Sequence, residues 1–348
     1  MKLTLSDYEV SFGDAAQLLS DFLCQQSFSS VAVLADENTA RDCLPKLAPL
    51  LSDFSASTIV IPSGERHKNI QTCEEIWQKM IATSLDRHSL LLNVGGGVVG
   101  DMGGFCAATF KRGMAFVQIP TTLLAQVDAS VGGKLGIDFG GVKNAVGVFQ
   151  SPRAVVIDVD FLHTLPQREL RSGFAEIVKH TLIADKNSWN ELQMLENITV
   201  EGLQKYILPS LLIKKNIVEA DPFERNIRKA LNFGHTVGHA LESYFLAGES
   251  PLLHGEAVAA GMVVEARLSH RLCGLHAQEL AAIEAFISKI FPGIKVVEQD
   301  FTPLLALMQQ DKKNEQLAIN FSLIAAIGQP SINQTCTEAD LKWAMLSP

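Results

Sequence analysis

Three of the histidines in the second half of the sequence, His235, His239 and His254, lie close together in segments whose apolar spacing predicts helices. His235 and His239 stand four residues apart, which places both imidazoles on one face of a helix, and His254 stands at the expected start of the next helix. Upstream, Glu176 and Lys179 project from a further expected helix. One carboxylate and two imidazoles form a common open metal site in enzymes, with positions left for water or substrate. The spacing alone favours His235 and His239 as the imidazole pair.

The alternative interpretation of these histidines is structural. A single histidine in a helix is more often a packed or surface residue than a metal ligand. Three histidines flanked by small glycines favour the metal interpretation, because such clusters are typical of functional sites. The sequence therefore predicts a metal centre in its second half.

A glycine-rich motif, Gly95-x-Gly97-x-x-Gly100, follows an apolar run and precedes a helical segment. Glycines let a backbone approach the phosphates of a dinucleotide, and a helix N-terminus supplies aligned N–H groups. A plain tight turn between strand and helix is the alternative. Asp36, which ends another expected strand, is positioned for a ribose hydroxyl. Taken alone, Asp36 is better interpreted as the cap of the helix expected near Thr39.

A further segment combines hydroxyls, an acid, paired glycines and a lysine between Pro120 and Lys134, and Lys143-Asn144 follows shortly. Lysines in a glycine-rich turn suit an anionic, phosphorylated ligand, and a solvated surface loop is the alternative. More cations lie at Lys214-Lys215 and between Asp221 and Arg228. For these, a solvated helix face is the favoured interpretation on sequence alone.

The elements expected to position these residues change character along the chain. The first half alternates β-branched runs with helix-length segments, which predicts a mostly parallel sheet with helices on its faces. The expected strands are Val31–Leu34, Thr58–Ile61, Leu90–Val94, Phe116–Ile119 and Ala154–Ile157. The second half shows helical spacing over 167–184, 200–220, 228–246 and 255–272, with a short hairpin expected around Leu317–Ile327.

This change predicts a Rossmann-like, NAD-binding α/β domain over residues 1–165 and a mainly α-helical, metal- and substrate-binding domain over 166–348. Ligands of parallel sheets bind outside the carboxyl ends of the strands, so we expect the active site in the cleft between the domains.

Composition narrows the possible functions. The chain has 348 residues, a net charge of −9 and no basic block, which argues against a nucleic-acid surface. Its most apolar stretch is interrupted by polar residues and glycines, so no membrane span is expected. The N-terminus has no secretory-signal pattern, and the six cysteines are scattered without a metal or disulfide spacing. We therefore expect a cytoplasmic enzyme with reduced thiols.

Taken together, the motifs closely resemble the 3-dehydroquinate synthase family of the sugar phosphate cyclase superfamily, from about Pro62 to Gly328. The motifs that carry the resemblance are Gly95–Asp101, Arg112-Gly113, Pro120–Asp128, Gly132-Gly133-Lys134, Thr164-Leu165-Pro166 with Arg168-Glu169, Ala175–Lys179, Leu231–Thr236, Leu253–Val258 and Asp311-Lys312-Lys313.

The resemblance implies a role for each candidate residue. It implies Glu176, His235 and His254 as ligands of Zn²⁺ or Co²⁺, in place of the His235–His239 pair. The implied contacts to NAD are Asp36, Asn38, Glu65, Lys68, Gly97, Val98, Val99, Gly100, Asp101, Thr121, Thr122, Lys134, Lys143, Phe161, Leu162, His163 and Thr164. The implied substrate and catalytic residues are Asp128, Lys134, Asn144, Lys179, Lys214, Arg228, Asn232, His239 and Lys312. Arg112 resembles a family arginine that reaches across a homodimer interface to the neighbouring active site.

The activity implied by the resemblance is a lyase reaction on a small sugar phosphate. It converts 3-deoxy-D-arabino-heptulosonate 7-phosphate into 3-dehydroquinate and phosphate, in the shikimate pathway of aromatic amino-acid biosynthesis. The expected steps are transient oxidation at C5 by NAD, phosphate elimination, re-reduction, ring opening and an intramolecular aldol closure.

Two alternatives are another sugar phosphate cyclase and a metal-dependent polyol or glycerol phosphate dehydrogenase. A cyclase whose substrate lacks a carboxylate would leave the charges of Lys214 and Arg228 unpaired, and a dehydrogenase would release NADH.

The sequence departs from the family pattern at four positions. Leu135 replaces a usual threonine, Val142 a glycine, His180 a common tyrosine and Pro222 an acid. None of these departures removes an expected metal ligand or substrate cation.

Overall fold

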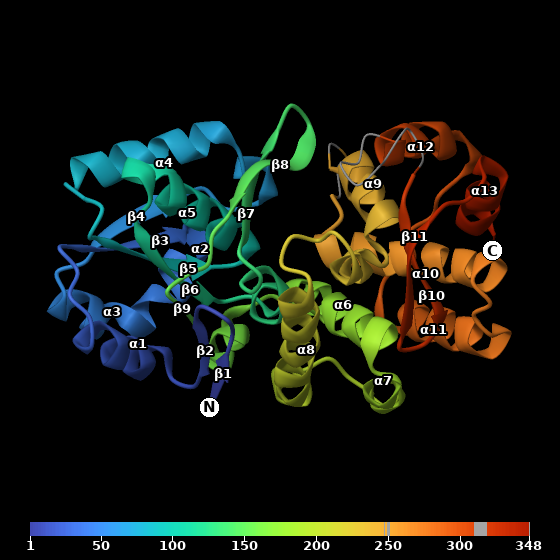
Figure 1. Cartoon of the computed structure of the whole chain (residues 1–348), viewed down its shortest axis with the longest axis horizontal. Coiled ribbons are helices and arrows are strands. Elements are labelled where there is room, and N and C mark those ends of the chain that lie inside the picture. The colour runs from blue at the N-terminus through green and yellow to red at the C-terminus, as the bar shows by residue number, and fades with distance from the viewer. Residues whose placement is uncertain (247, 249–250, 310–318, 348) are drawn as a thin grey trace. The chain divides into compact units, whose positions relative to one another are not determined.

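All five apolar runs of the first half form strands of one sheet, as predicted. A computed structural model describes residues 1–246, 248, 251–309 and 319–347. The chain divides into two compact units, Met1–Pro166 and Gln167–Pro348 (Figure 1). The strands of the first unit are β1 (Lys2–Thr4), β2 (Glu9–Phe12), β3 (Val31–Asp36), β4 (Ser57–Ile61), β5 (Leu90–Gly95), β6 (Ala115–Pro120), β7 (Lys134–Phe139), β8 (Val142–Phe149) and β9 (Ala154–Ile157).

The seven-stranded sheet has the order β1-β2-β9-β6-β5-β3-β4, and every pair from β2 to β4 is parallel. The chain leaves β3 toward β4 on one side, whereas β5 lies on the other side of β3. The strand order therefore reverses between β3 and β5. Such a reversal opens a crevice at the carboxyl ends of the two strands, which are Asp36 and Gly95.

Helices cover both faces of this sheet because its strands are apolar on both sides. The helices of the first unit are α1 (Ala15–Cys24), α2 (Glu37–Asp42), α3 (Leu44–Asp53), α4 (Ile70–Ala82) and α5 (Gly97–Thr109). Within β3, Ala32 and Leu34 pack with α4 and α5, whereas Val31 and Val33 pack with α1 and α3. This alternation follows the two-residue period of a strand, and Figure 1 shows the resulting three layers.

Two strand pairs of the first unit were not predicted. β1 pairs antiparallel with β2 at the edge of the sheet. β7 and β8 form a separate antiparallel hairpin, in which Gly140 and Gly141 make the two-residue turn with φ of 60° and 81°. Two successive positive φ values define the turn type that suits a tight hairpin. This hairpin begins at Lys134 and includes Lys143 and Asn144, which were expected to bind a phosphorylated ligand.

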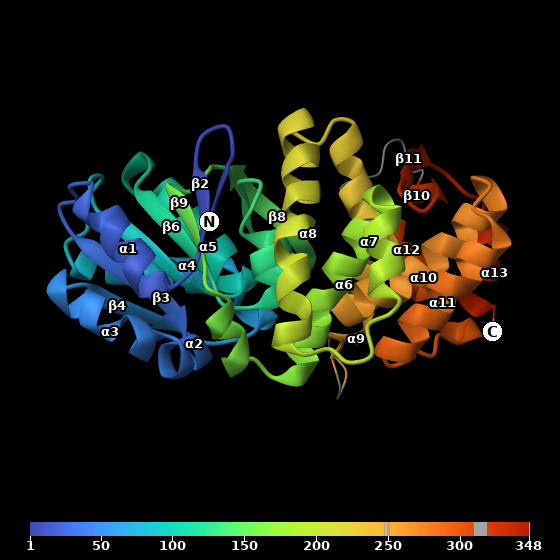
Figure 2. The ribbon, with the colours of Figure 1, turned by 90° about the horizontal axis from the view of Figure 1, so that it is seen from below.

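The second unit is mainly helical, as predicted. Its helices are α6 (Gln167–Ala184), α7 (Lys186–Leu192), α8 (Val200–Ala220), α9 (His235–Phe245), α10 (His254–Leu272), α11 (Ala277–Ile290), α12 (Phe301–Gln309) and α13 (Glu338–Leu346). Helix α10 is central, because it packs against α6, α9, α11 and α13 (Figures 1 and 2).

The structure differs from the prediction at two places in this unit. The segment expected as one helix over 228–246 is a 3-10 turn, Ile227–Asn232, followed by α9. The expected hairpin is formed by β10 (Phe321–Ala326) and β11 (Gln329–Gln334), a few residues later than predicted. Among the described residues, no helix combines the length and the apolar character needed to cross a membrane.

Candidate active site

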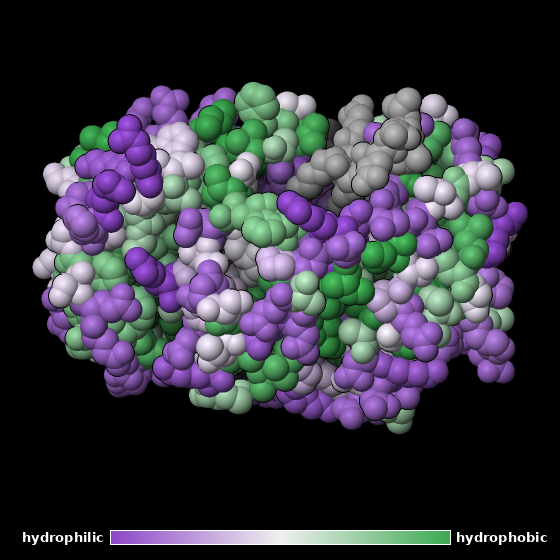
Figure 3. Space-filling model, in the orientation of Figure 1, coloured by the Kyte–Doolittle hydropathy of each residue, from purple (hydrophilic) through white to green (hydrophobic). Residues whose placement is uncertain are grey.

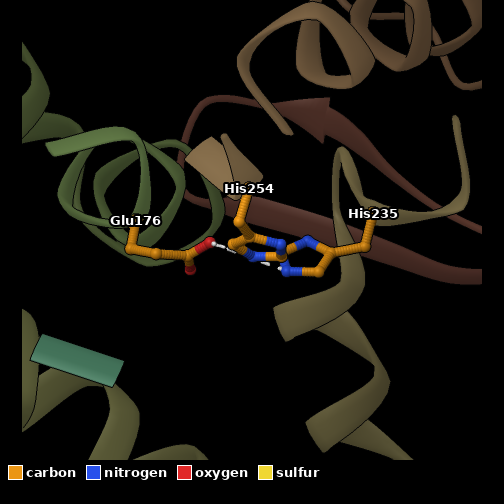
Figure 4. Close-up of side chains that lie close together, drawn as sticks. All are labelled: Glu176, His235 and His254. Carbon is orange, nitrogen blue, oxygen red and sulfur yellow. Dashed lines mark ion pairs between the residues drawn. The ribbon is translucent and has the colours of Figure 1, made fainter. Parts of the chain in front are cut away.

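Glu176, His235 and His254 converge in the second unit from three different helices. The Nε2 atoms of His235 and His254 lie 3.6 and 3.5 Å from the same oxygen, Oε1 of Glu176. One ligand atom from each residue lies within 4.8 Å of the others (Figure 4). The carboxylate of Glu176 is fully buried. The three residues named by the family resemblance are therefore placed so that one divalent ion could contact all of them.

In each imidazole, the nitrogen that does not face Glu176 has a hydrogen-bond acceptor beside it. Nδ1 of His235 lies 3.2 Å from the backbone oxygen of Phe233, and Nδ1 of His254 lies 3.2 Å from Oε2 of Glu242. Because a carbonyl and a carboxylate only accept, Nδ1 carries the hydrogen in each neutral ring. The lone pair of each Nε2 is then available on the side of Glu176.

The surroundings of the cluster shift the pKa values of the two imidazoles in opposite directions. Burial and the ammonium of Lys179 lower the pKa of His235 well below its usual value. Burial also acts to lower the pKa of His254, but the carboxylates of Glu176 and Glu242 outweigh it and raise this pKa to about 9. Lys179 is itself buried and forms an ion pair with Glu176. These two carboxylates thus favour positive charge at Nε2 of His254, and either a proton or a divalent ion could supply it.

His239 lies beside the cluster. Its ring centroid is 5.2 Å from that of His235 and 5.8 Å from that of His254. Within the described part of the chain, His239 does not belong to a group of ligand atoms as close as that of Glu176, His235 and His254. His239, the choice from helical spacing alone, is therefore not favoured as a metal ligand, and its place beside the three candidate ligands fits a role toward substrate.

Glycines allow the helices that carry these residues to approach closely. Gly234 has a left-handed φ of 80°, and a Cβ there would lie 2.9 Å from the backbone oxygen of Val258 in α10. A Cβ on Gly261 would lie 2.0 Å from the backbone oxygen of Gly234, and one on Gly255 would lie 1.9 Å from the backbone oxygen of Ser172 in α6. Side chains cannot fit at these contacts. The left-handed Gly234 also explains why the predicted helix over 228–246 is interrupted.

Buried carboxylates fix the helix ends near the cluster. Glu265 of α10 accepts hydrogen bonds from the backbone N–H groups of Gly234, at 2.6 Å, and Val237, at 3.2 Å. Arg168 of α6 donates to both oxygens of Glu256 in α10, each at 2.7 Å. These contacts tie α9 and α6 to α10, which carries His254.

The expected substrate cations of the second unit lie in segments that pack together. The 3-10 turn Ile227–Asn232 contacts both α6 and α8. Arg228 is buried and donates from Nη1 to the backbone oxygen of Pro222, at 2.5 Å. Lys214 of α8 is buried, and Nδ2 of Asn232 donates to Glu224 at 2.7 Å. Lys312 lies outside the described residues.

The glycine-rich motif of the first unit forms the predicted strand-to-helix turn. Gly97, Val98 and Val99 form the first turn of α5, and no side chain caps this helix end at Gly96. A Cβ on Gly96 would lie 2.9 Å from Cγ2 of Thr122. A small cavity opens here and is lined by Gly95, Gly96, Gly97, Gly100, Gln118, Pro120, Ala125, Ala129 and Ser130. The glycines of the turn thus line a small cavity beside the N-terminus of α5, and a helix N-terminus is a position that suits an anionic group.

The neighbouring segment after β6 carries three more candidates. Thr121 is buried, and Oγ1 of Thr122 accepts a hydrogen bond from the backbone N–H of Ala125 at 3.1 Å. Asp128 lies in a π-helical turn, Ala125–Ala129. π-Helical turns are rare in proteins, and many of those that occur lie at functional sites.

The candidates Glu65, Lys68, Asp101, Lys143 and Asn144 form one polar cluster. Lys68 is buried and contacts Asp101 at 2.5 Å and Oδ1 of Asn144 at 2.7 Å. Lys143 contacts Glu65 at 3.2 Å. Burial acts to lower the pKa of Lys68, but the carboxylates of Asp101 and Glu65 outweigh it and raise this pKa. The cluster therefore joins the start of α5 to the β7–β8 hairpin.

The remaining candidates of the first unit are dispersed. Asp36 caps α2 by accepting a hydrogen bond from the backbone N–H of Thr39 at 2.8 Å, and Asn38 lies in the first turn of that helix. Phe161, Leu162, His163 and Thr164 form most of a 3-10 turn, in which the first two are buried and the last two exposed. Lys134 is exposed at the start of β7.

Arg112 is exposed and has a left-handed φ of 68°. Its neighbours Lys111 and Gly113 also have positive φ, of 47° and 116°. Backbone conformations that are unfavourable for non-glycine residues concentrate at functional sites.

Sequence reasoning missed three residues that support the candidates. Glu242 contacts His254, Glu265 holds the start of α9, and Asp138 accepts a hydrogen bond from the backbone N–H of Asn144 at 2.7 Å. Glu242 stands seven residues after His235, on the same helix face, which was the available signal. For the other two, no local pattern indicated the contact.

One departure from the family pattern has a packing role. A Cβ on Gly104 of α5 would lie 2.4 Å from Cδ2 of Leu135. Leu135 is buried at this contact and belongs to the core between α5 and the sheet.

Comparisons with known proteins identify a family over most of the chain. The family model of the 3-dehydroquinate synthase N-terminal region matches residues 58–172, and that of the C-terminal region matches residues 173–314. A 3-dehydroquinate synthase of Parabacteroides distasonis is 42% identical over 327 residues, which cover 93% of each protein.

Solved structures share the fold. A 2-epi-5-epi-valiolone synthase from Streptomyces hygroscopicus with NAD⁺ and Zn²⁺ bound superposes with a TM-score of 0.87 at 26% identity, over 99% of this chain and 97% of that one. A 2-deoxy-scyllo-inosose synthase complexed with carbaglucose-6-phosphate, NAD⁺ and Co²⁺ gives 0.87 at 23% identity, over 99% of both. Because both family models match and the identity to a curated member is 42%, the chain belongs to the 3-dehydroquinate synthase family.

Proposed function

We propose that this chain converts 3-deoxy-D-arabino-heptulosonate 7-phosphate into 3-dehydroquinate and phosphate, with NAD and a divalent metal ion, Zn²⁺ or Co²⁺, as cofactors. The observation that carries the proposal is the convergence of Glu176, His235 and His254 in a chain of this family. Among the other expected groups, Lys179 and His239 lie beside this cluster, and Gly97 to Asp101 lie at the start of α5.

The donor set fits a catalytic metal ion. A carboxylate and two neutral imidazoles provide three ligands and leave positions for substrate oxygens. The two Nδ1–H groups already have acceptors in Phe233 and Glu242, which fixes both rings with Nε2 toward Glu176. When bound, the metal would polarise the hydroxyl that is oxidised, and NAD would take up and return the hydride.

The turn between β5 and α5 fits the diphosphate of NAD. Gly96 and Gly97 lie at the reversal of strand order, where they line a small cavity at the start of α5, a helix end that no side chain caps. We propose that Asp36 contacts a ribose hydroxyl while it caps α2, since a carboxylate can accept several hydrogen bonds. Lys68, Asp101 and Lys143 would flank the nucleotide from the polar cluster beside it.

The substrate carries a phosphate and a carboxylate, which call for two groups of cations. We assign Lys134, Asn144, Lys312 and Arg112 to the phosphate. The buried Lys214 and Arg228 suit the carboxylate, with Asn232 beside them, because a guanidinium can bind a carboxylate bidentately. Asp128, Lys179 and His239 would relay protons near the oxidised carbon.

We further propose that the enzyme acts as a homodimer in the cytoplasm. Three large apolar side chains of the β7–β8 hairpin, Phe139, Val146 and Phe149, are exposed, and Figure 3 shows hydrophobic surface in this part of the first unit. Exposed apolar clusters favour protein contacts. All six cysteines are free, which suits a reducing compartment. Arg112, held exposed by its left-handed turn, would reach the active site of the partner subunit.

Another sugar phosphate cyclase is the alternative favoured by the structural neighbours. The substrate carboxylate distinguishes the two functions, because a charged end group would gain charge-assisted hydrogen bonds from Lys214 and Arg228 that a neutral end group would lack. We expect phosphate release from the heptulosonate phosphate and little from a sugar phosphate of equal length without the carboxylate. Faster release from the second compound would contradict the proposal.

A further inference from the structure

Glu242 is a buried carboxylate that no sequence motif singled out and that takes no part in the proposed chemical steps. It lies in α9, two turns after His235, and its side chain is 6% exposed. Its Oε2 lies 3.2 Å from Nδ1 of His254, which belongs to α10. The helix that supplies one imidazole of the cluster thus also supplies the outer partner of the other imidazole.

The two imidazoles differ in this outer partner. Nδ1 of His235 faces a neutral backbone oxygen, that of Phe233, whereas Nδ1 of His254 faces a carboxylate. When Nδ1–H is hydrogen-bonded to a carboxylate, the ring gains more electron density than when it is bonded to a carbonyl. The other nitrogen, Nε2, then donates its electron pair to a metal ion more strongly. The hydrogen bond also prevents the ring from turning, because both nitrogens are then engaged.

We propose that Glu242 is the positioning residue for the metal site: it holds His254 in the tautomer and orientation that present Nε2 to the ion, and it makes His254 the stronger of the two imidazole donors. This inference rests on the metal site of the proposed function. Glu242 lies behind His254 relative to Glu176, so it acts through the imidazole.

Metal affinity tests the inference without any measurement of turnover. The full chain is stripped of metal with a chelator and titrated with Zn²⁺ and Co²⁺ against a chromogenic competitor. Glu242→Gln keeps the size and an acceptor oxygen but removes the charge, whereas Glu242→Ala removes the contact. Asp300→Asn is the matched control, because Asp300 is also buried in this unit but accepts hydrogen bonds from Tyr244 and Val297.

We expect the dissociation constant for the metal to rise about 10–100-fold in Glu242→Ala and less in Glu242→Gln. The visible absorption spectrum of bound Co²⁺ should change in Glu242→Gln and stay unchanged in Asp300→Asn. Equal affinities and spectra for the parent and both Glu242 variants would overturn the inference while leaving the metal site intact. If the parent itself binds neither ion, the metal site of the proposed function fails, and the inference fails with it.

Discussion

His235, His239 and His254 have equivalent side chains, and their surroundings give them different roles. The Nε2 atoms of His235 and His254 face Oε1 of Glu176, and the ring of His239 lies alongside both. Helical spacing could show that His235 and His239 share a face, but it could not show which imidazole a third helix approaches. That third helix is α6, which carries Glu176, and its carboxylate lies beside His235 and His254.

Substitution of single histidines separates ligand from proton relay. His254→Ala should abolish turnover and lower the metal content of the purified protein, because a ligand is lost. His239→Ala should slow turnover by about 10²–10⁴-fold with metal retained, as expected for the loss of a general acid or base. Metal analysis of both variants beside the parent checks this assignment. A metal content that fell only in the His239 variant would show that the ligand assignment is wrong.

Elements position these residues through close backbone contacts. The sequence predicted α6 and α8 over the residues that form them, because their apolar positions recur at helical spacing. The prediction of a single helix over 228–246 is wrong, because Gly234, with its left-handed φ, lies between the 3-10 turn and the start of α9. A glycine inside a helical pattern does not by itself reveal that another backbone lies against it.

The contact between α9 and α10 can be tested at Gly261. A methyl group there would lie 2.0 Å from the backbone oxygen of Gly234. Gly261→Ala should therefore lower the free energy of unfolding of the second unit by about 1–3 kcal/mol and reduce metal binding, since the helices must separate. The control is Gly293→Ala, where a Cβ would meet nothing within 4 Å. Urea unfolding of the two variants checks the difference, and equal stabilities would contradict the packing account.

The turn that carries Arg228 depends on Asp221. Burial acts to raise the pKa of Asp221, but hydrogen bonds from the backbone N–H groups of Arg225, Asn226 and Arg228 outweigh it and lower this pKa. A lowered folded-state pKa gives stability that is present above the unfolded-state value, about 4, and is lost as the pH falls through the folded-state value.

Asp221→Asn should therefore lower the free energy of unfolding by about 1 kcal/mol at neutral pH, because a charged acceptor is lost. The gap to the parent should begin to close below about pH 4, and it should vanish only when the pH falls below the lowered folded-state pKa of Asp221, where the carboxyl of the parent is protonated. Urea unfolding across a pH series measures this gap, with Glu196→Gln as an exposed control. A gap that stayed constant down to the lowest pH would refute the role of the charge.

At the scale of the whole molecule, both units belong to one enzyme family, and each contributes a different set of groups. The first unit supplies the exposed turn at Gly96 and the polar cluster around Lys68, and the second supplies the cluster around Glu176. The sequence predicted both units, because their periodicities differ. It did not reveal the β7–β8 hairpin, although Gly140-Gly141 between apolar runs is a hairpin signal.

The proposed action of Arg112 in the partner subunit is tested by complementation. Arg112→Ala and His254→Ala should each be inactive alone. If Arg112 acts across a two-fold dimer, co-expression of both variants in equal amounts should restore about a quarter of the parental activity, because each mixed dimer holds one complete site. Mixed dimers without activity would place Arg112 in its own active site.

The proposed function requires that the chain use NAD as a recycled cofactor in a phosphate elimination. The most direct measurement follows phosphate release and NADH absorbance together, with the full chain, the heptulosonate phosphate, NAD⁺ and Zn²⁺. We predict many equivalents of phosphate for each NAD, 3-dehydroquinate as the product and no net NADH. Accumulation of one NADH for each substrate consumed, or oxidation without phosphate release, would contradict the account and indicate a dehydrogenase.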